Sequence, residues 1–280
     1  MRAWPDIYLP PSGGRSHPTL NLFDSFQERL VPIPHGLFTS YVCGITPYDA
    51  THLGHAATYV TFDLVHRYMY ATGADVHFVE NITDIDDPLF ERAHRDKIDW
   101  KDLARSQVEL FLSDMTALRV LPPKKYEGVV ENMDLIISAV QELVNRGATY
   151  SLDGDLYFDL QSGDPGLMNL PLPLSEAISV FKERGGDPDR TGKRHPLDAL
   201  LWRRSNSGEP EWSTPFGAGR PGWHIECVAL ALSYLPASNT SSITLQGGGA
   251  DLIFPHHYMT AIQARALNDK PFASRSEEHT

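Results

Sequence analysis

This sequence of 280 residues has few cysteines and lacks long apolar runs. Only two cysteines occur, Cys43 and Cys227, and their wide separation in a reducing compartment favours thiolates or metal ligands over a disulfide. No apolar run has the length of a membrane span, and Trp4 and three prolines interrupt the first eleven residues, where a signal peptide would be apolar. We therefore expect a cytoplasmic protein without a membrane partner.

Basic residues are also scarce, since 24 Lys and Arg stand against 36 Asp and Glu, for a formal net charge of −12. A nucleic-acid partner needs a basic face, so this total disfavours tRNA, although a local basic patch stays compatible with it. Hydrophobic residues make up 41% of the chain and charged residues 21%. This composition supports a full core and indicates one α/β domain with insertions.

The stretch at 41–55, YVCGITPYDATHLGH, joins a strand pattern to a helix pattern. Residues 39–42 predict a short buried strand, and residues 53–72 carry apolar side chains at helical spacing before a glycine. His52 and His55 are therefore expected at a helix N-terminus beside the carboxyl end of a strand, a position that favours phosphate. From spacing alone, a chance pair of surface histidines stays an open alternative.

Two further strand patterns end at segments that suit a ligand. Residues 75–80 predict a strand followed by NITDIDD at 81–87. The aspartates of this segment could bind a metal, but capping and turn chemistry before a helix from Pro88 is favoured. Residues 243–246 predict another buried strand, and the glycines at 247–249 would let backbone approach an adenosine or ribose closely.

The other segments give simpler patterns. Pro, Gly and Ser are frequent in residues 1–20, which predicts an extended lead-in on the domain surface. Residues 99–147 are helical in pattern with a break at two prolines, and residues 148–160 predict a β-hairpin closed by Asp153-Gly154. A further helix is expected at 228–235.

Several motifs together resemble a known family. HLGH at 52–55 is similar to the HIGH signature of class I aminoacyl-tRNA synthetases, and three other motifs resemble its cysteine-activating branch: NITDIDD at 81–87, GWHIEC at 222–227 and GGGADLIFPHH at 247–257. They occur in family order over about residues 20–270. The resemblance implies an α/β fold, a Rossmann-like (HUP-type) parallel sheet with an inserted connective subdomain. It also implies that L-cysteine and ATP, with Mg²⁺, are substrates and that cysteinyl-adenylate is formed.

The resemblance also implies a division of the chain. Residues 22–33 would form an early outer strand or hairpin. The expected segments are an N-terminal lead-in and outer segment (1–35), the first half of the nucleotide-binding catalytic domain (36–120), a helical and hairpin connective insertion (121–200), the second half with the zinc and adenylate segments (201–274), and a non-native tail (275–280).

The resemblance assigns roles to individual residues. Thr46, His52 and His55 would be catalytic by holding phosphate. The nucleotide and adenylate pocket would comprise Cys43, Gly44, Ile45, Thr46, Thr58, Asn81, Ile82, Thr83, Trp223, Gly249, Ala250 and Asp251.

A zinc ion is the implied cofactor, with Cys43, Cys227 and His256 as its ligands. Without the resemblance, three residues scattered this widely would seldom indicate a metal site. In cysteinyl-tRNA synthetases a glutamate four residues after this histidine is the fourth ligand, but here Thr260 stands there. Three protein ligands leave the fourth coordination position of the zinc open for the substrate thiolate.

The branch has two members, and three features favour the mycothiol ligases, which join cysteine to the amine of glucosaminyl-inositol. ERGGDP at 183–188 resembles a marker of those ligases, which also lack the glutamate replaced by Thr260, and the acidic total disfavours tRNA. Tyr258 departs from the acidic residue usual in the family, and extra residues are expected in the loop at 238–242. A cysteinyl-tRNA synthetase fragment and a non-catalytic zinc-binding fragment remain the alternatives.

The second signature of the family, KMSKS, does not occur in this sequence. It would follow the PHH segment, and its lysines hold the leaving phosphates. Residues 275–280, RSEEHT, resemble the in-frame translation of a common sequencing adapter. We therefore expect that the native protein continues beyond them and that this chain catalyses poorly.

Overall fold

A computed structural model describes residues 2–11, 16–206, 208–238 and 240–279. The chain divides into two compact units: unit 1 is Met1–Glu131, Tyr234–Asp251 and Ala273–Thr280, and unit 2 is Asn132–Ser233 and Leu252–Phe272. Parts of three expected segments lie outside the described residues, namely residues 1 and 12–15 of the lead-in, residues 207 and 239 of the segment at 201–274, with 239 in the loop at 238–242, and residue 280 of the tail.

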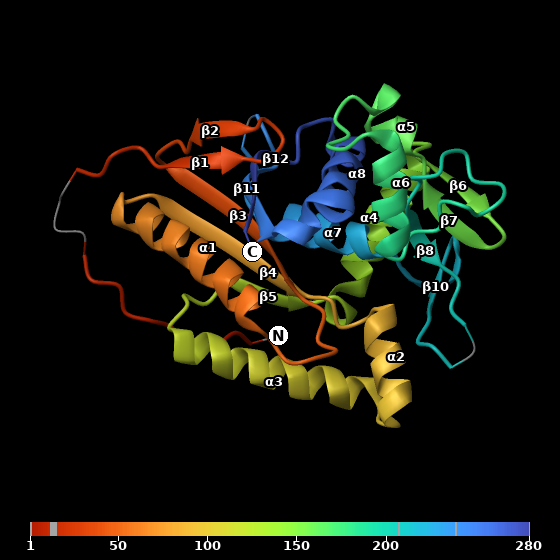
Figure 1. Ribbon diagram of the computed structural model, residues 1–280, viewed down its shortest axis with the longest axis horizontal. Helices are drawn as coiled ribbons and strands as arrows, with labels where there is room; N and C mark the ends of the chain where they lie inside the picture. Colours follow the sequence, from red (N-terminus) through yellow and green to blue (C-terminus); the bar gives the residue numbers. More distant parts are fainter. Residues whose placement is uncertain (1, 12–15, 207, 239, 280) are drawn as a thin grey trace. The chain divides into compact units, whose positions relative to one another are not determined.

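Unit 1 is organised around a parallel sheet with the strand order β12-β11-β3-β4-β5 (Figure 1). Every neighbouring pair in this sheet is parallel, which confirms the predicted α/β class. The inner strands are almost wholly buried, as expected for parallel strands. The bounds are β3 Leu37–Ile45, β4 Asp75–Ile82, β5 Lys125–Gly128, β11 Ile243–Gly249 and β12 Ala273–His279.

Three helices belong to unit 1: α1 Leu53–Ala71, α2 Asp87–Asp96 and α3 Trp100–Leu118. The helix predicted at 53–72 is confirmed by α1, whose buried face includes Phe62 and Met69. α3 lies alongside α1, where the rings of Tyr59 and Phe111 meet edge to face with centroids 5.0 Å apart (Figure 1). Asp86 caps α2 by accepting a hydrogen bond from the Asp87 N–H, which agrees with the capping interpretation of these aspartates.

The N-terminal segment is more deeply packed than the sequence predicted. β1 Asn21–Asp24 and β2 Arg29–Pro32 form the expected outer hairpin. The lead-in, however, is not confined to the surface, because Trp4 is only 5% exposed and belongs to the core of unit 1. Its indole N–H donates to the Val120 carbonyl at 2.7 Å. An aromatic anchor therefore fixes a segment whose Pro-rich composition predicted only an extended lead-in on the domain surface.

Unit 2 combines helices with an antiparallel sheet of order β6-β7-β8-β10-β9. The hairpin predicted at 148–160 is confirmed, and both of its turn residues, Asp153 and Gly154, have positive φ. The bounds are α4 Met133–Asn145, β6 Thr149–Leu152, β7 Asp155–Phe158, α5 Leu160–Gly163, α6 Leu174–Glu183, β8 Leu200–Arg203, β9 Trp212–Thr214, β10 Gly217–Pro221, α7 Trp223–Tyr234 and α8 Tyr258–Asn268, with short helical turns at Pro165–Leu167 and Ile253–His257. Two more short helical turns, Val130–Asn132 and Ala250–Leu252, lie where the chain passes from unit 1 to unit 2.

Several elements differ from their sequence predictions. β5 interrupts the region predicted as helical, and α7 begins at Trp223 instead of at 228. Residues 121–131 lie in unit 1 and residues 201–233 in unit 2, while the division expected from the family stays a prediction. Among the described residues, no helix combines the length and the apolar composition needed to cross a membrane.

Candidate active site

The carboxyl ends of three neighbouring strands of unit 1 carry most of the predicted nucleotide-binding residues. β3 ends with Cys43, Gly44 and Ile45, and Thr46 follows it. β4 ends with Asn81 and Ile82 before Thr83, and β11 ends with Gly249 before Ala250 and Asp251. Because β4, β3 and β11 are adjacent and parallel, these segments lie along one edge of the sheet, where α/β proteins bind ligands.

Close contact between backbones joins the ends of β3 and β4. The Gly44 N–H donates to Oδ1 of Asn81 at 2.9 Å, and Nδ2 of Asn81 donates to Oγ1 of Thr83 at 3.1 Å. A Cβ on residue 44 would lie 1.6 Å from the Asn81 carbonyl oxygen. Only glycine fits there, and the Asn81 side chain bridges the two segments.

Cys43 is buried at the end of β3, and its backbone is held by α1. The phenol of Tyr59 donates to the Cys43 carbonyl at 3.2 Å, and burial raises the pKa of Tyr59 well above its usual value. Tyr59 therefore stays a neutral donor at physiological pH. Sequence reasoning missed this residue because the helical pattern shows only that its ring faces the core.

His52 and His55 form a reciprocal cap at the start of α1. His52 is the N-cap residue, and its Nδ1 accepts from the Gly54 N–H at 3.1 Å. Nδ1 of His55 accepts from the His52 N–H at 3.2 Å, and the two rings lie 4.1 Å apart. The two side chains thus satisfy backbone donors that an uncapped helix leaves unpaired.

This cap determines where a neutral imidazole carries its proton. A ring nitrogen that accepts an N–H bond cannot be protonated, so the remaining proton of each ring is on Nε2. The pKa of His55 is lowered by burial and by His52, against an opposing effect of Asp251, which favours the neutral ring. Each ring then offers one Nε2–H donor beside the positive end of the helix dipole.

Two predicted pocket residues are already engaged within unit 1. Oγ1 of Thr58 donates to the Gly54 carbonyl at 3.1 Å, one turn earlier in α1. The Thr46 carbonyl accepts from the Tyr48 N–H at 2.9 Å, which tightens the chain just after β3. Thr46 is half-buried and Thr58 is buried.

The other predicted metal and adenylate residues come together in unit 2. Sγ of Cys227 lies 3.3 Å from Nε2 of His256, and the indole of Trp223 stacks on the His256 ring at 4.2 Å. Nδ1 of His256 lies 3.0 Å from Nδ1 of His224. Burial lowers the pKa of His256 well below its usual value and that of His224 to about 3, so both rings are neutral. His224 was not singled out from the sequence, although it stands three residues before Cys227.

The residues of the predicted zinc site fit that metal chemically. Neither cysteine forms a disulfide and both are buried. Thiolates and a neutral imidazole are the ligands that zinc prefers, and a shared tetrahedral zinc separates a sulfur and a nitrogen ligand by about 3.6 Å. The 3.3 Å between Cys227 and His256 is close to that value. Cys43, the third residue of the predicted set, is a buried thiol near the end of β3 in unit 1.

Two departures from the family pattern have definite places in unit 2. Tyr258 is buried, and its phenol donates to Oδ2 of Asp164 at 2.8 Å, so it joins α8 to the turn after α5. Thr260 is fully buried in α8, and its Oγ1 has no hydrogen-bond partner among the residues that the structure describes. The sequence alone gave no signal for the Tyr258 contact because Asp164 lies far away along the chain.

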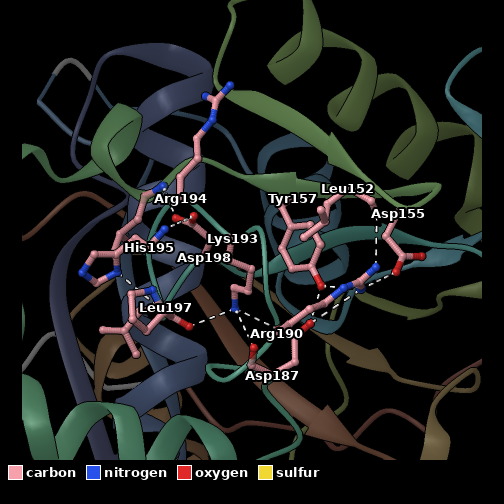
Figure 2. Close-up of polar contacts among 12 residues, drawn as sticks. Leu152, Asp155, Tyr157, Asp187, Arg190, Lys193, Arg194, His195, Leu197 and Asp198 are labelled. Atoms are coloured by element: carbon pink, nitrogen blue, oxygen red, sulfur yellow. Dashed lines mark hydrogen bonds and ion pairs between the residues drawn. The ribbon is translucent and has the colours of Figure 1, made fainter.

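The ERGGDP segment closes α6 and enters a network of charged side chains (Figure 2). Asp187 accepts from the phenol of Tyr157 and from Nζ of Lys193, the latter at 2.8 Å. Arg190 donates to Oδ2 of Asp155 at 2.6 Å and to the Tyr157 oxygen at 2.7 Å. Since these donors contact acceptors of the protein itself, the segment stabilises the fold of unit 2 through side-chain hydrogen bonds.

Comparisons with known proteins identify the fold and the family of this chain. The family described as tRNA synthetases class I (C) catalytic domain matches residues 29–276. Among solved structures, Mycobacterium tuberculosis methionyl-tRNA synthetase in complex with methionyl-adenylate is similar with a TM-score of 0.63 and 15% identity, over 86% of this chain and 56% of that chain. At this identity the likeness shows the fold alone, which is that of a class I synthetase catalytic domain.

Curated relatives narrow the class further. The L-cysteine:1D-myo-inositol 2-amino-2-deoxy-alpha-D-glucopyranoside ligase of Gordonia bronchialis is 51% identical over 285 residues, covering 100% of this chain and 68% of that protein. The protein of the same name from Kribbella flavida is 52% identical and covers 98% of this chain and 67% of that protein. The chain therefore belongs to the class I synthetase family of enzymes and, within it, to the branch of these cysteine:glucosaminyl-inositol ligases.

Proposed function

We propose that the protein ligates L-cysteine to the amine of glucosaminyl-inositol at the expense of ATP, through cysteinyl-adenylate, as a step of mycothiol biosynthesis. The names of its relatives support the two substrates. The strand-end site of unit 1 supports the use of ATP, because a helix N-terminus with two imidazole donors suits phosphate. The net charge of −12 supports an amino sugar over tRNA as the acceptor.

In the first step, the carboxylate of cysteine attacks the α-phosphorus of ATP, and the bond to the bridging oxygen breaks to release pyrophosphate. His52 and His55 donate from Nε2 to the phosphate oxygens on which negative charge grows, and Thr46 assists beside them. Asn81, Thr83 and the segment from Gly249 to Asp251 would line the adenylate. The rate arises from positioning and charge stabilisation, without a covalent enzyme intermediate.

Cysteine is selected by its sulfur. Cys43, Cys227 and His256 would hold zinc, which supplies a fourth position for the substrate thiolate. His256 stays neutral, and its Nδ1 lies against His224, which fixes the ring orientation. The close approach of Cys227 and His256 within unit 2 is the observation that carries this part of the proposal.

In the second step, the amine of glucosaminyl-inositol attacks the activated carbonyl. A C–N bond forms, the C–O bond to AMP breaks, and the amine proton passes to solvent. The products are the amide and AMP. The Nε2–H donors of the histidine pair remain on the α-phosphate and stabilise the departing AMP.

The variant Cys227→Ser tests the proposal. It should lose bound zinc, measured by metal analysis, and cysteine-dependent exchange of pyrophosphate into ATP. Ala229→Ser is the matched control, because it places a hydroxyl at another buried position of α7. Zinc and exchange both retained in Cys227→Ser would refute the zinc assignment.

The acceptor is tested by mass spectrometry of reactions that contain cysteine, ATP and either glucosaminyl-inositol or tRNA. An amide with the amino sugar is expected, whereas esterified tRNA would establish the alternative.

Residues 275–280 are proposed to be non-native, which is supported by the buried Ser276 and Glu277 in β12, where a parallel strand is usually apolar. Sequencing the source DNA across codon 275 checks this proposal.

A further inference from the structure

The segment that joins β3 to α1, residues 46–52, carries two of the proposed phosphate-binding side chains but has little apolar anchoring. Pro47 is buried, whereas Tyr48, Asp49 and Ala50 are exposed. His52 has an extended backbone, with φ −129° and ψ 177°, so α1 does not impose helical geometry on it. Polar contacts from the neighbouring helices must therefore hold this segment in place.

The first contact comes from α3. Oγ1 of Thr51, the residue directly before the N-cap, donates to Oδ2 of Asp114. Asp114 follows Phe111 by three residues, so both side chains project from the same side of α3. Phe111 is fully buried against Tyr59 of α1. Helix α3 thus packs against α1 through Phe111 and is hydrogen-bonded through Asp114 to the segment that precedes α1.

The second contact comes from α2. Nη1 of Arg92 lies 3.2 Å from Oδ1 of Asp49, and the Nε of the same guanidinium contacts Asp96. Asp49 also accepts from the Ala50 N–H at 2.8 Å. This ion pair is more exposed than the Thr51–Asp114 contact and is expected to contribute less, because solvent screens surface pairs.

We propose that Asp114 is a positioning residue for the histidine pair, which it holds through Thr51. The contact fixes the residue before the N-cap, and the N-cap geometry in turn fixes both Nδ1 acceptor bonds and hence the direction of both Nε2–H donors. Asp114 itself has no role in contacting substrate. The inference rests on the proposed function, since it assigns Asp114 to the phosphate side of that site.

The test uses the full chain and a sulfamoyl analogue of cysteinyl-adenylate, with affinity measured by calorimetry. Thr51→Val removes the hydroxyl at nearly constant shape, Asp114→Ala removes the acceptor, and Thr51→Ser retains the hydroxyl. Glu109→Ala is the matched control, because it removes an exposed carboxylate from the same helix. The first two variants should each weaken binding about tenfold, since a displaced catalytic group is costly. Thr51→Ser and the control should stay within about twofold of the unaltered chain.

Coupling between the two residues separates positioning from general destabilisation. If Asp114 acts through Thr51, the double variant Thr51→Val with Asp114→Ala should bind about as weakly as either single variant. Nitrogen-15 spectra of labelled histidine should show the same displacement of the His52 and His55 signals in both single variants. Zinc content should not change, because the zinc ligands are other residues.

The outcomes are distinct. Unaltered affinity and unaltered histidine signals in Thr51→Val or Asp114→Ala would overturn the proposal, as would additive effects in the double variant. A lower melting temperature without either change would show a merely structural contact and would also overturn it. If the unaltered chain fails to bind the analogue, the proposed function fails, and the histidine spectra still decide whether Asp114 positions the pair.

Discussion

Replacing Glu80 with glutamine should make unit 1 more stable at neutral and alkaline pH. Glu80 lies on β4, opposite Val42 of β3 and Tyr126 of β5, and is only 2% exposed. Its Oε2 has no hydrogen-bond partner among the residues that the structure describes. Burial, assisted by the nearby Asp63, raises the pKa of Glu80 from 4.5 to about 8. At a pH between these two pKa values, the carboxyl is therefore protonated in the folded chain and ionised in the unfolded chain.

The sign of the pH dependence follows from this difference. Between the unfolded pKa of 4.5 and the folded pKa of about 8, the folded state binds more protons, so stability falls as pH rises through that window. Integration of the linkage relation gives a loss of about 3 to 4 kcal/mol between pH 5 and pH 8. Since a domain is stabilised by only about 5–15 kcal/mol, this loss is a large fraction of the total.

Urea denaturation of the unaltered chain and of Glu80→Gln at pH 5 and pH 8 measures the effect. Other titrating groups contribute equally to both proteins, so the difference between their pH dependences isolates Glu80. The expected difference is about 3 to 4 kcal/mol, with glutamine the more favourable residue at pH 8. The control Glu109→Gln, on the exposed face of α3, should follow the unaltered chain. Parallel stability profiles for Glu80→Gln and the unaltered chain would refute the reasoning.

Three other changes have defined outcomes. Gly44→Ala places a Cβ against the Asn81 carbonyl and should destabilise unit 1 by about 3 kcal/mol or lower the soluble yield, measured by denaturation; unchanged stability would contradict the contact. Lys193→Met removes a cation that is 2% exposed and faces Asp187, at an expected cost of about 2 kcal/mol in the same assay, whereas Lys182→Met on the surface should cost almost nothing. Burial lowers the pKa of His66 to about 3, so stability should fall as pH drops below 6.5, by about 2 kcal/mol at pH 5. His66→Gln should remove that slope, and a slope that persists unchanged would rule out His66 as its source.

The local patterns of the sequence predicted the elements that carry the proposed phosphate-binding residues. The strands β3 and β4 follow from their apolar pattern, and the helix from 53 and strand β11 follow from apolar spacing together with the glycines that follow or end them. The hairpin closed by Asp153-Gly154 follows from turn chemistry. The family motifs indicated which of these ends belong together, and the order of the parallel strands confirmed that they are neighbours.

Short elements and long-range anchors were beyond sequence reasoning. β5 has four residues, Lys-Tyr-Glu-Gly, without an apolar run, and it is a strand because it pairs with β4. Trp4 is buried because the core of unit 1 offers its indole a carbonyl acceptor at Val120. Tyr258 departs from the family pattern, and only the fold showed that Asp164 accepts its hydrogen bond. Each depends on a partner that is distant in sequence.

The sequence by itself determined the class of this protein and the residue types proposed for its chemistry, because helix starts, strand ends and motif spacing are local properties of the chain. Tertiary structure decided the protonation and orientation of those residues. The capping bonds of His52 and His55, the neutral state of His256 beside His224, and the contact of Asp114 with Thr51 all arise from burial and from pairs of elements. Burial and hydrogen-bond geometry depend on the packed neighbours of a residue, which its position in the sequence does not specify.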